Sequence, residues 1–271
     1  MILKICNLQK IYTPLDDPSR PIVALKDIDL EVQKGEFLSI IGPSGCGKST
    51  LFEMIGGLIP ATRGEIYIDG EQVQGPHPDI GMVFQEDSTF PWQTVMENVE
   101  FGLEMRGVPK KERREICQGM VHLVGLSGFE NRYPSELSGG MRQRVAIART
   151  LVLNPKIILM DEPFGALDEQ TRLILGEELL RIWQETGATI LFVTHSITES
   201  VQLSDRILVM TARPGTIKKV VIDDLERPRT AAVVASLRFA QLVNEIWETL
   251  KVEASKGLTL RSPKDDAGRP G

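Results

Sequence analysis

Gly42-Pro43-Ser44-Gly45-Cys46-Gly47-Lys48-Ser49-Thr50 is the stretch from which the fold class of this chain follows. The apolar run 36–41 directly before it predicts a buried strand, and residues 51–55 after it predict the start of a helix. A strand, a glycine-rich turn with Lys-Ser, and a helix form the context in which G-x-x-x-x-G-K-[ST] binds phosphate. The sequence therefore predicts an α/β fold organised around a phosphate-binding loop.

The residue types in this loop suit a nucleoside triphosphate. Its glycines lack Cβ atoms, so the backbone can curl and present successive N–H groups to phosphate oxygens. The following helix directs its positive end at the same anion. We expect Lys48 to reach the β- and γ-phosphates and the Ser49 hydroxyl to take one Mg²⁺ position. Cys46 is expected to be tolerated in the loop without a chemical role.

Composition narrows the class of protein. The chain has 271 residues, enough for one large domain or two small ones, and its net charge of −6 argues against broad contact with nucleic acid. Three scattered cysteines suit a reducing compartment. The sequence shows neither a cleavable signal pattern nor an apolar run of bilayer length, so any membrane role is expected to require a partner.

The rest of the chain divides into segments with different hydrophobic spacing. Residues 1–41 predict strands, whereas residues 87–155 show helical spacing without strand runs and predict an inserted helical subdomain. The mixed charges of 110–115 predict a solvated helix face, and the polar tail from Ser255 predicts disorder. Helices are expected at 95–105, 110–124, 140–153, 169–186 and 231–252, and further strands at 64–70, 80–84, 155–163, 188–195, 205–210 and 217–222.

Two further segments carry chemistry. A buried strand that ends in Asp161-Glu162 would deliver both acids to the nucleotide crevice. Asp161 fits the Mg²⁺ shell, and Glu162 fits a general base for the attacking water. Ser138-Gly139-Gly140 opens a helix and predicts a second anion-binding helix terminus, because capping explains Ser138 and at most one of the glycines.

Four features have two readings each. Gln85 and His195 stand at strand ends, where they could reach the site; otherwise Gln85 would be a surface residue and His195 a structural one. Tyr12 could be a half-buried aromatic or could stack on a base. Phe90-Pro91-Trp92 could pack under its own loop, or its exposure would mark a partner site.

Taken together, these motifs resemble the ATP-binding subunit of an ABC transporter over residues 2–225. The specific part is Leu137-Ser138-Gly139-Gly140 with Gln143-Arg144, about one helix before Asp161-Glu162-Pro163. The resemblance implies a P-loop NTPase core with a small antiparallel β subdomain and the helical subdomain at about 87–155. A C-terminal helical extension would cover 226–254, and a tail 255–271. Family members dimerise head to tail around ATP.

The resemblance also implies roles. Tyr12 would stack on adenine, while Ser138 and Gly140 would contact the γ-phosphate across the dimer. Gln85 would sense Mg²⁺ and water, Asp168 would tie the two sites together, and His195 would contact the γ-phosphate. The implied catalytic residues are Glu162, His195 and Gln85; the nucleotide-binding residues are Tyr12, residues 42–50, Ser138, Gly139, Gly140 and Asp168; and the Mg²⁺ ligands are Ser49, Gln85 and Asp161.

Within the family, Phe90-Pro91-Trp92, Met141 and Met210-Thr211-Ala212-Arg213-Pro214-Gly215 look like the nitrate/sulfonate/taurine importer group. The implied partners are a second copy of the chain in the ATP-bound state, membrane permease subunits that would dock near Trp92, and indirectly a solute-binding protein. Nucleic acid is not expected as a partner. The implied location is peripheral, at the cytoplasmic face of the cell membrane.

Two alternatives belong to other classes. A soluble cassette ATPase acting on DNA would carry a long coiled coil between Lys48 and Asp161, but only 113 positions separate them, without sustained heptads. Ribosome-acting forms carry two cassettes, and one is visible here. A small-metabolite kinase with a phosphate loop would need neither Ser138-Gly139-Gly140 nor His195.

Overall fold

The computed structural model describes residues 1–14, 17–84, 89–165 and 167–260. They belong to two compact units. The first contains Met1–Gln33, Leu38–Gly75 and the chain from Thr194, and the second contains Lys34–Phe37 and Pro76–Val193. The predicted helical subdomain lies within the second unit, which also includes strands of the α/β core.

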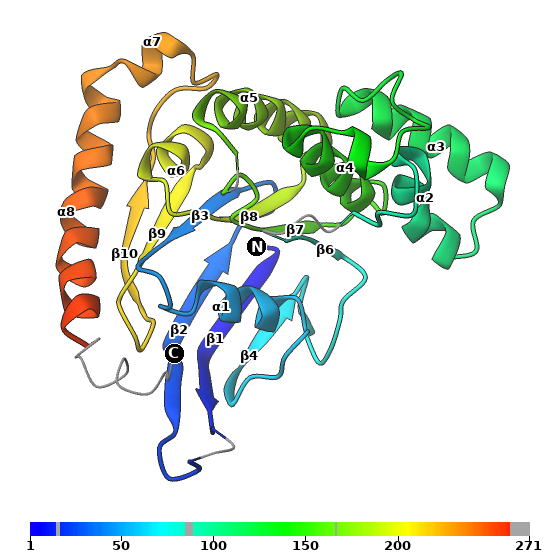
Figure 1. Cartoon of the computed structure of the whole chain (residues 1–271). Helices are drawn as coiled ribbons and strands as arrows, with labels where there is room; N and C mark the ends of the chain where they lie inside the picture. Colours follow the sequence, from blue (N-terminus) through cyan, green and yellow to red (C-terminus); the bar gives the residue numbers. More distant parts are fainter. Residues whose placement is uncertain (15–16, 85–88, 166, 261–271) are drawn as a thin grey trace, which may run out of the picture. The chain divides into compact units, whose positions relative to one another are not determined.

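An antiparallel sheet opens the first unit, in the order β2-β1-β4-β5 (Figure 1). Its strands are β1 (Leu3–Tyr12), β2 (Ile22–Val32), β4 (Arg63–Ile68) and β5 (Glu71–Gln72). β2 begins five residues before the alternating pattern at Asp27 suggests. Asn7 and Asp27 adopt left-handed backbone conformations, and the β1–β2 register shifts between Ile5 and Ile11. Such irregularities interrupt the period-two pattern without ending the strand.

The first unit also contains β3 (Phe37–Ile41, from Leu38 onward), β9 (Arg206–Met210) and β10 (Ile217–Ile222). β3 runs parallel to β9, and β9 pairs antiparallel with β10. The helices α6 (Ile197–Leu203), α7 (Ala231–Val234) and α8 (Leu237–Leu260) complete this part of the unit (Figure 1). Their apolar side chains share one core with the strands, made of Ile41, Val201, Ile207, Val209, Val221, Phe239, Leu242 and Ile246.

Helix α8 corrects one prediction. Disorder from Ser255 is wrong for 255–260, because the helix continues to Leu260. Once a helix is nucleated, each added residue gains a backbone hydrogen bond, so weak helix formers at its end can still be helical. Helix α6 has no counterpart among the predicted elements. Within the described ranges, no helix combines the length and apolar character needed to cross a bilayer.

The second unit contains parallel strands in the order β8-β7-β6. Their bounds are Ile80–Val83 for β6, Ile157–Asp161 for β7 and Thr189–Val193 for β8. Continuous burial of β7 and β8 is typical of parallel strands covered on both faces. Helix α5 (Glu169–Thr186) is anchored by Trp183, which packs edge-on against Phe37 and donates a hydrogen bond to the Gly35 carbonyl at 3.1 Å.

The remaining elements of the second unit are α2 (Val95–Met105), α3 (Lys110–Leu123), the short 3-10 helix η1 (Pro134–Glu136) and α4 (Gly139–Leu151). They agree with the helical spacing predicted for this part of the chain within residues 89–155, and the bounds of the subdomain stay a prediction. The charged run 110–115 is not wholly a solvated face, because Arg113 and Arg114 both pair with the buried Glu100 of α2 at 3.3 and 3.0 Å. A buried carboxylate needs such partners to offset its lost hydration, and here they link α2 to α3.

Candidate functional site

In the first unit, the phosphate loop (residues 42–49) has the strained backbone that its glycines predict. Gly45 and Gly47 adopt φ values of 74° and 106°. A Cβ on Gly47 would lie 2.8 Å from Leu25 Cδ2, so this position requires glycine for its conformation and for its space. Helix α1 (Lys48–Ile55) begins directly after Gly47, three residues earlier than expected. The free N–H groups of its first turn therefore belong to the loop itself.

The side chains of the loop divide into buried and exposed sets. Lys48 is buried, and its Nζ donates to the carbonyls of Gly42 and Pro43 at 3.0 and 3.4 Å. Cys46 is also buried, and burial raises the pKa of its thiol, which supports a packing role. Ser44 and Ser49 are exposed. A hydroxyl on the first turn of α1 is an oxygen donor of the kind that Mg²⁺ accepts.

Tyr12 and His195 belong to the same unit as the phosphate loop. Tyr12 is the last residue of β1 and pairs with Ile22 of β2. Two residues further along β2, the Ala24 carbonyl lies close to the phosphate loop: a Cβ added to Gly47 would be 3.2 Å from it. The Tyr12 ring is half exposed, with Lys10 Nζ 5.1 Å from its centre. The ring is therefore not a core residue, and its stacking on a base stays a prediction.

His195 is exposed and directly follows Thr194. The Thr194 N–H donates to the Ile40 carbonyl at 3.3 Å, which ties the backbone before His195 to the strand that leads into the phosphate loop. Thr194 Oγ1 also hydrogen bonds to Glu199 of α6 and accepts the Ser196 N–H at 3.0 Å. These contacts fix the backbone on both sides of the histidine.

The second unit holds the acidic pair. Asp161 is the last residue of β7, and the Glu162 N–H donates to the Val193 carbonyl at 2.9 Å. Glu162 has φ of 45°. The other described non-glycine residues in the left-handed region are Asn or Asp, which tolerate it, whereas Glu pays a cost of about 1 kcal/mol or more. Backbone strain of this kind collects at functional sites, so the observation supports Glu162 as a candidate.

The same unit brings the Ser138-Gly139-Gly140 segment against the start of α5. Ser138 caps α4 by accepting the Met141 N–H at 3.3 Å. A Cβ on Gly140 would lie 3.0 Å from Thr171 Cγ2. Asp168 accepts the Thr171 N–H and hydroxyl at 2.9 and 2.7 Å, and the backbone N–H bond holds the pKa of Asp168 below its usual value. Thr171 thus hydrogen bonds to Asp168 and also lies close to Gly140.

This packing adds a second reason for the two glycines. Capping accounts for Ser138, as expected, and Leu167 and α5 restrict the space at Gly139 and Gly140. A Cβ on Gly139 would lie 3.2 Å from Leu167 Cδ2, and a Cβ on Gly140 would contact Thr171 and Leu175. Contacts at these distances leave little room for a larger residue. An anion-binding role for the segment therefore remains a prediction.

The remaining candidates lie in the entry to the helical subdomain. Gln85 falls outside the described residues. The Trp92 side chain has an exposed fraction of 71%, so it is not a core residue. Phe90 packs against Trp92 and Phe101 with ring centres 5.6 and 4.7 Å apart, and the Arg149 guanidinium lies 4.9 Å from its ring.

Asn98 of α2 is a site residue that the sequence did not reveal. It is fully buried, and its amide oxygen accepts the Phe90 N–H at 2.7 Å. Its amide nitrogen donates to the carbonyls of Phe90, Gln93 and Thr94 at 3.2, 3.0 and 2.9 Å. A single side chain therefore holds the aromatic loop (residues 90–94). A buried asparagine in a helix has no periodic signature that would single it out.

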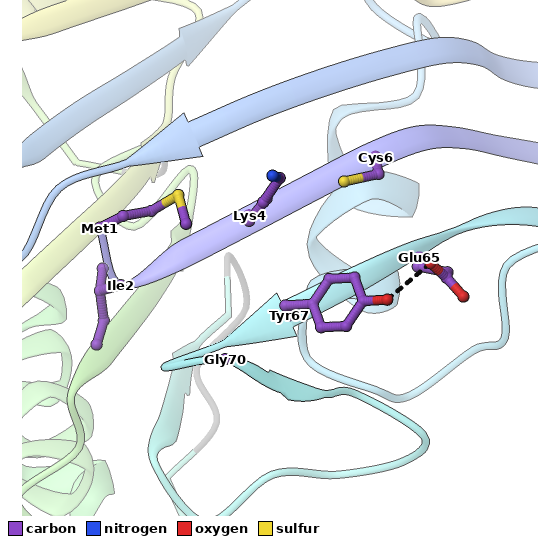
Figure 2. Close-up of a pocket in the computed structure, with 7 residues that line it drawn as sticks. All are labelled: Met1, Ile2, Lys4, Cys6, Glu65, Tyr67 and Gly70. Carbon is purple, nitrogen blue, oxygen red and sulfur yellow. Dashed lines mark hydrogen bonds between the residues drawn. The ribbon is translucent and has the colours of Figure 1, made fainter.

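A separate depression of about 380 Å³ lies on the antiparallel sheet of the first unit (Figure 2). The Tyr67 hydroxyl donates to Glu65 at 2.7 Å within it, and this bond raises the pKa of Tyr67. Its lining residues are Met1, Ile2, Lys4, Cys6, Glu65, Tyr67 and Gly70. They include none of the residues that the motifs single out, so this depression is not the predicted nucleotide site.

Comparison with known proteins agrees with the motifs. The family model for ABC transporters matches residues 25–165. An uncharacterized ABC transporter ATP-binding protein of Methanocaldococcus jannaschii is 53% identical over 256 residues, which cover 94% of each chain. The nitrate import ATP-binding protein NrtD of Synechocystis is 45% identical over 93% of this chain and 96% of its own. The aliphatic sulfonates import ATP-binding protein SsuB of Bacillus cereus is 48% identical over 78% and 83%.

Solved structures agree on the fold. The ATP-binding cassette MJ0796, in a dimeric post-hydrolysis state bound to ADP and Pi, aligns with a TM-score of 0.71 at 36% identity, over 82% of this chain and 98% of that one. The structure of cbiO1 from Clostridium perfringens, part of the transporter complex cbiONQ, aligns with a TM-score of 0.73 at 27% identity, over 97% and 96%. The chain belongs to the ABC transporter family, as a P-loop ATPase subunit that binds ATP and couples its hydrolysis to transport.

Proposed function

We propose that this subunit powers an importer for a small anion such as nitrate, a sulfonate or taurine. Two import proteins, for nitrate and for aliphatic sulfonates, share 45% and 48% of their aligned residues with it. The observation that carries the catalytic part is Glu162, held with φ of 45° at the end of β7. A general base must be positioned for its proton before its pKa matters, and a fixed backbone supplies that position.

The nucleotide site is assigned residue by residue. Residues 42–50 would bind the phosphates, largely through backbone N–H groups (which Pro43 lacks), with Lys48 neutralising the β- and γ-phosphates and Tyr12 stacking on adenine. Ser49, Gln85 and Asp161 would hold Mg²⁺, since hydroxyl, amide and carboxylate oxygens suit this hard cation. When bound, the ion neutralises phosphate charge. Glu162 would accept the proton of the attacking water, and His195 would contact the γ-phosphate.

ATP binding would close a head-to-tail homodimer. Ser138, Gly139 and Gly140 of one copy would face the γ-phosphate held by its partner, and Asp168 would connect the two sites. That a similar cassette is dimeric when bound to ADP and Pi supports dimerisation as such. Much of such a contact is made through the ligand, so dimerisation is expected to depend on nucleotide.

The aromatic loop would dock a short helix of the membrane permease. Trp92 offers a large exposed apolar surface, and Asn98 holds the loop beneath it. Exposed aromatics on a fixed support are typical of partner sites. The chain would then sit peripherally at the cytoplasmic face of the membrane and act indirectly with a solute-binding protein.

Glu162→Gln tests the catalytic assignment. The amide keeps the shape of the carboxylate but cannot take a proton from water at neutral pH, so ATP turnover should fall about 10²- to 10⁴-fold. ATP affinity should be retained, and sedimentation with ATP and Mg²⁺ should show an accumulated dimer. Glu177→Gln, at an exposed glutamate of α5, is the matched control and should leave turnover unchanged. Near-normal turnover by Glu162→Gln would remove this residue from the role.

A further inference from the structure

The turn between β9 and β10 (residues 211–216) lies against the phosphate loop in the first unit. Arg213 donates from Nε and Nη2 to the Gly45 carbonyl at 3.3 and 3.2 Å. Gly215 approaches the loop so closely that a Cβ there would lie 2.0 Å from the Cys46 carbonyl oxygen. The turn is also bonded to β2, because the Gly215 N–H donates to Ala24 and the Lys26 N–H donates to Gly215.

Helix α8 holds the same turn from its other side. Glu253 is 2% exposed, and its Oε2 accepts the Ala212 N–H at 3.1 Å. Its Oε1 accepts from Lys218 Nζ of β10 at 2.6 Å. Burial of a carboxylate is costly unless it is bonded, so these donors fix the Glu253 side chain in place. The C-terminal helix is thereby attached to the residue next to Arg213.

The turn is internally braced and can act as a rigid link. Thr211 Oγ1 donates to the Pro214 carbonyl at 2.8 Å and accepts the Thr216 N–H at 2.9 Å. The Thr211 N–H donates to the Thr216 carbonyl at 3.0 Å. Hydrogen bonds across a short turn restrict its backbone, so a displacement at Ala212 would also displace Arg213.

We propose that Arg213 is a positioning residue for the phosphate loop and that Glu253 of α8 holds Arg213 in place. Gly45 sits at φ of 74° in an exposed part of the loop, and a glycine peptide there is free to rotate unless something restrains it. The N–H of the same peptide belongs to Cys46 and donates to the Pro43 carbonyl at 3.2 Å, while the Arg213 guanidinium holds its carbonyl from outside the loop. The two bonds together would fix this peptide plane and the course of the backbone that, in the proposed function, binds phosphate. A loop organised before binding loses less entropy when nucleotide arrives, so the C-terminal helix contributes to nucleotide affinity.

The first test compares ADP binding, with Mg²⁺ present, by calorimetry on the full chain. Arg213→Ala should weaken affinity about tenfold, the loss expected for one charge-assisted hydrogen bond at a part-exposed site. Because Arg213 is exposed, thermal melting should be nearly unchanged. Arg213→Lys keeps the charge without the fork and should recover little. The control Arg238→Ala removes an exposed arginine that pairs with Asp224 in the same unit, and should bind normally.

Two outcomes would overturn the role of Arg213. Wild-type affinity in Arg213→Ala would show that the contact does not organise the loop. Full affinity in Arg213→Lys would show that positive charge alone suffices. The affinity of the unchanged chain is measured in the same series, so a failure of nucleotide binding itself would be visible separately.

A double-mutant cycle tests the link to α8. Glu253→Ala should weaken ADP binding several-fold, and Glu253→Gln, which retains the shape and an acceptor oxygen, should weaken it less. In the Arg213→Ala background, Glu253→Ala should have little further effect, because both changes remove the same restraint on the Gly45 peptide. Additive losses would overturn the link. Glu248→Ala, at an exposed glutamate of α8, is the matched control, and all titrations are done well below each variant's melting temperature.

Discussion

The phosphate loop and the aromatic loop carry the two proposed recognition sites, yet their shapes have different origins. The conformation of the phosphate loop depends first on its own glycines, whose φ values of 74° and 106° few other residues adopt, although Arg213 also contacts it from outside. The aromatic loop is shaped from outside, by the Asn98 side chain of α2, which bonds Phe90, Gln93 and Thr94. A loop of the first kind can be recognised from its sequence, whereas a loop of the second kind cannot.

The largest effect is expected from Gly47→Ala. The new Cβ would meet Leu25 Cδ2 at 2.8 Å and would need φ of 106°, so nucleotide affinity should fall about 100-fold and stability by about 1–3 kcal/mol. Gly70→Ala is the control, since φ there is 87° but no atom lies within 4 Å of the new Cβ. It should lose some stability and no affinity. Equal affinity in both variants would break the account of a self-shaped phosphate loop.

Asn98→Ala tests the externally shaped loop. Removal of the amide takes away the partner of the Phe90 N–H and of the Gln93 carbonyl, whereas the Phe90 and Thr94 carbonyls still accept backbone N–H groups, so unfolding free energy should fall by about 1–3 kcal/mol. Chemical denaturation measures the change, with the exposed Asn131→Ala as control. If Asn98→Ala were as stable as that control, the conformation of residues 90–94 would not depend on Asn98.

The smallest effect is expected from Trp92→Ala. Its ring is 71% exposed and packs chiefly on Phe90, so unfolding free energy should change by about 1 kcal/mol or less. Trp183→Ala removes a tryptophan that packs on Phe37 and bonds Gly35, and should cost about 3 kcal/mol. Similar melting temperatures for the two variants would contradict this contrast between a presented and a structural tryptophan.

The fold was predictable where local pattern and tertiary structure agree. The strand and turn before Lys48, the helices at 95–105 and 169–186, and the strand ending in Asp161 appear where the sequence indicates, and α1 follows the turn three residues earlier than expected. The start of β2, helix α6 and the end of α8 were not predicted. Bulges hide the β2 alternation, α6 is too short for a periodic signal, and α8 continues past Ser255 because helix growth is cooperative.

By itself, the sequence determined the phosphate loop, the acidic strand end and the family, because these depend on residue types at short, fixed spacing. Tertiary structure alone decided the exposure of Trp92, the packing of Gly140 on Thr171, and the contacts of Asn98 and Glu253. The last three join an element to a segment outside it, and Glu253 bonds a residue 41 positions away. Such contacts follow from how elements pack, which local spacing does not encode.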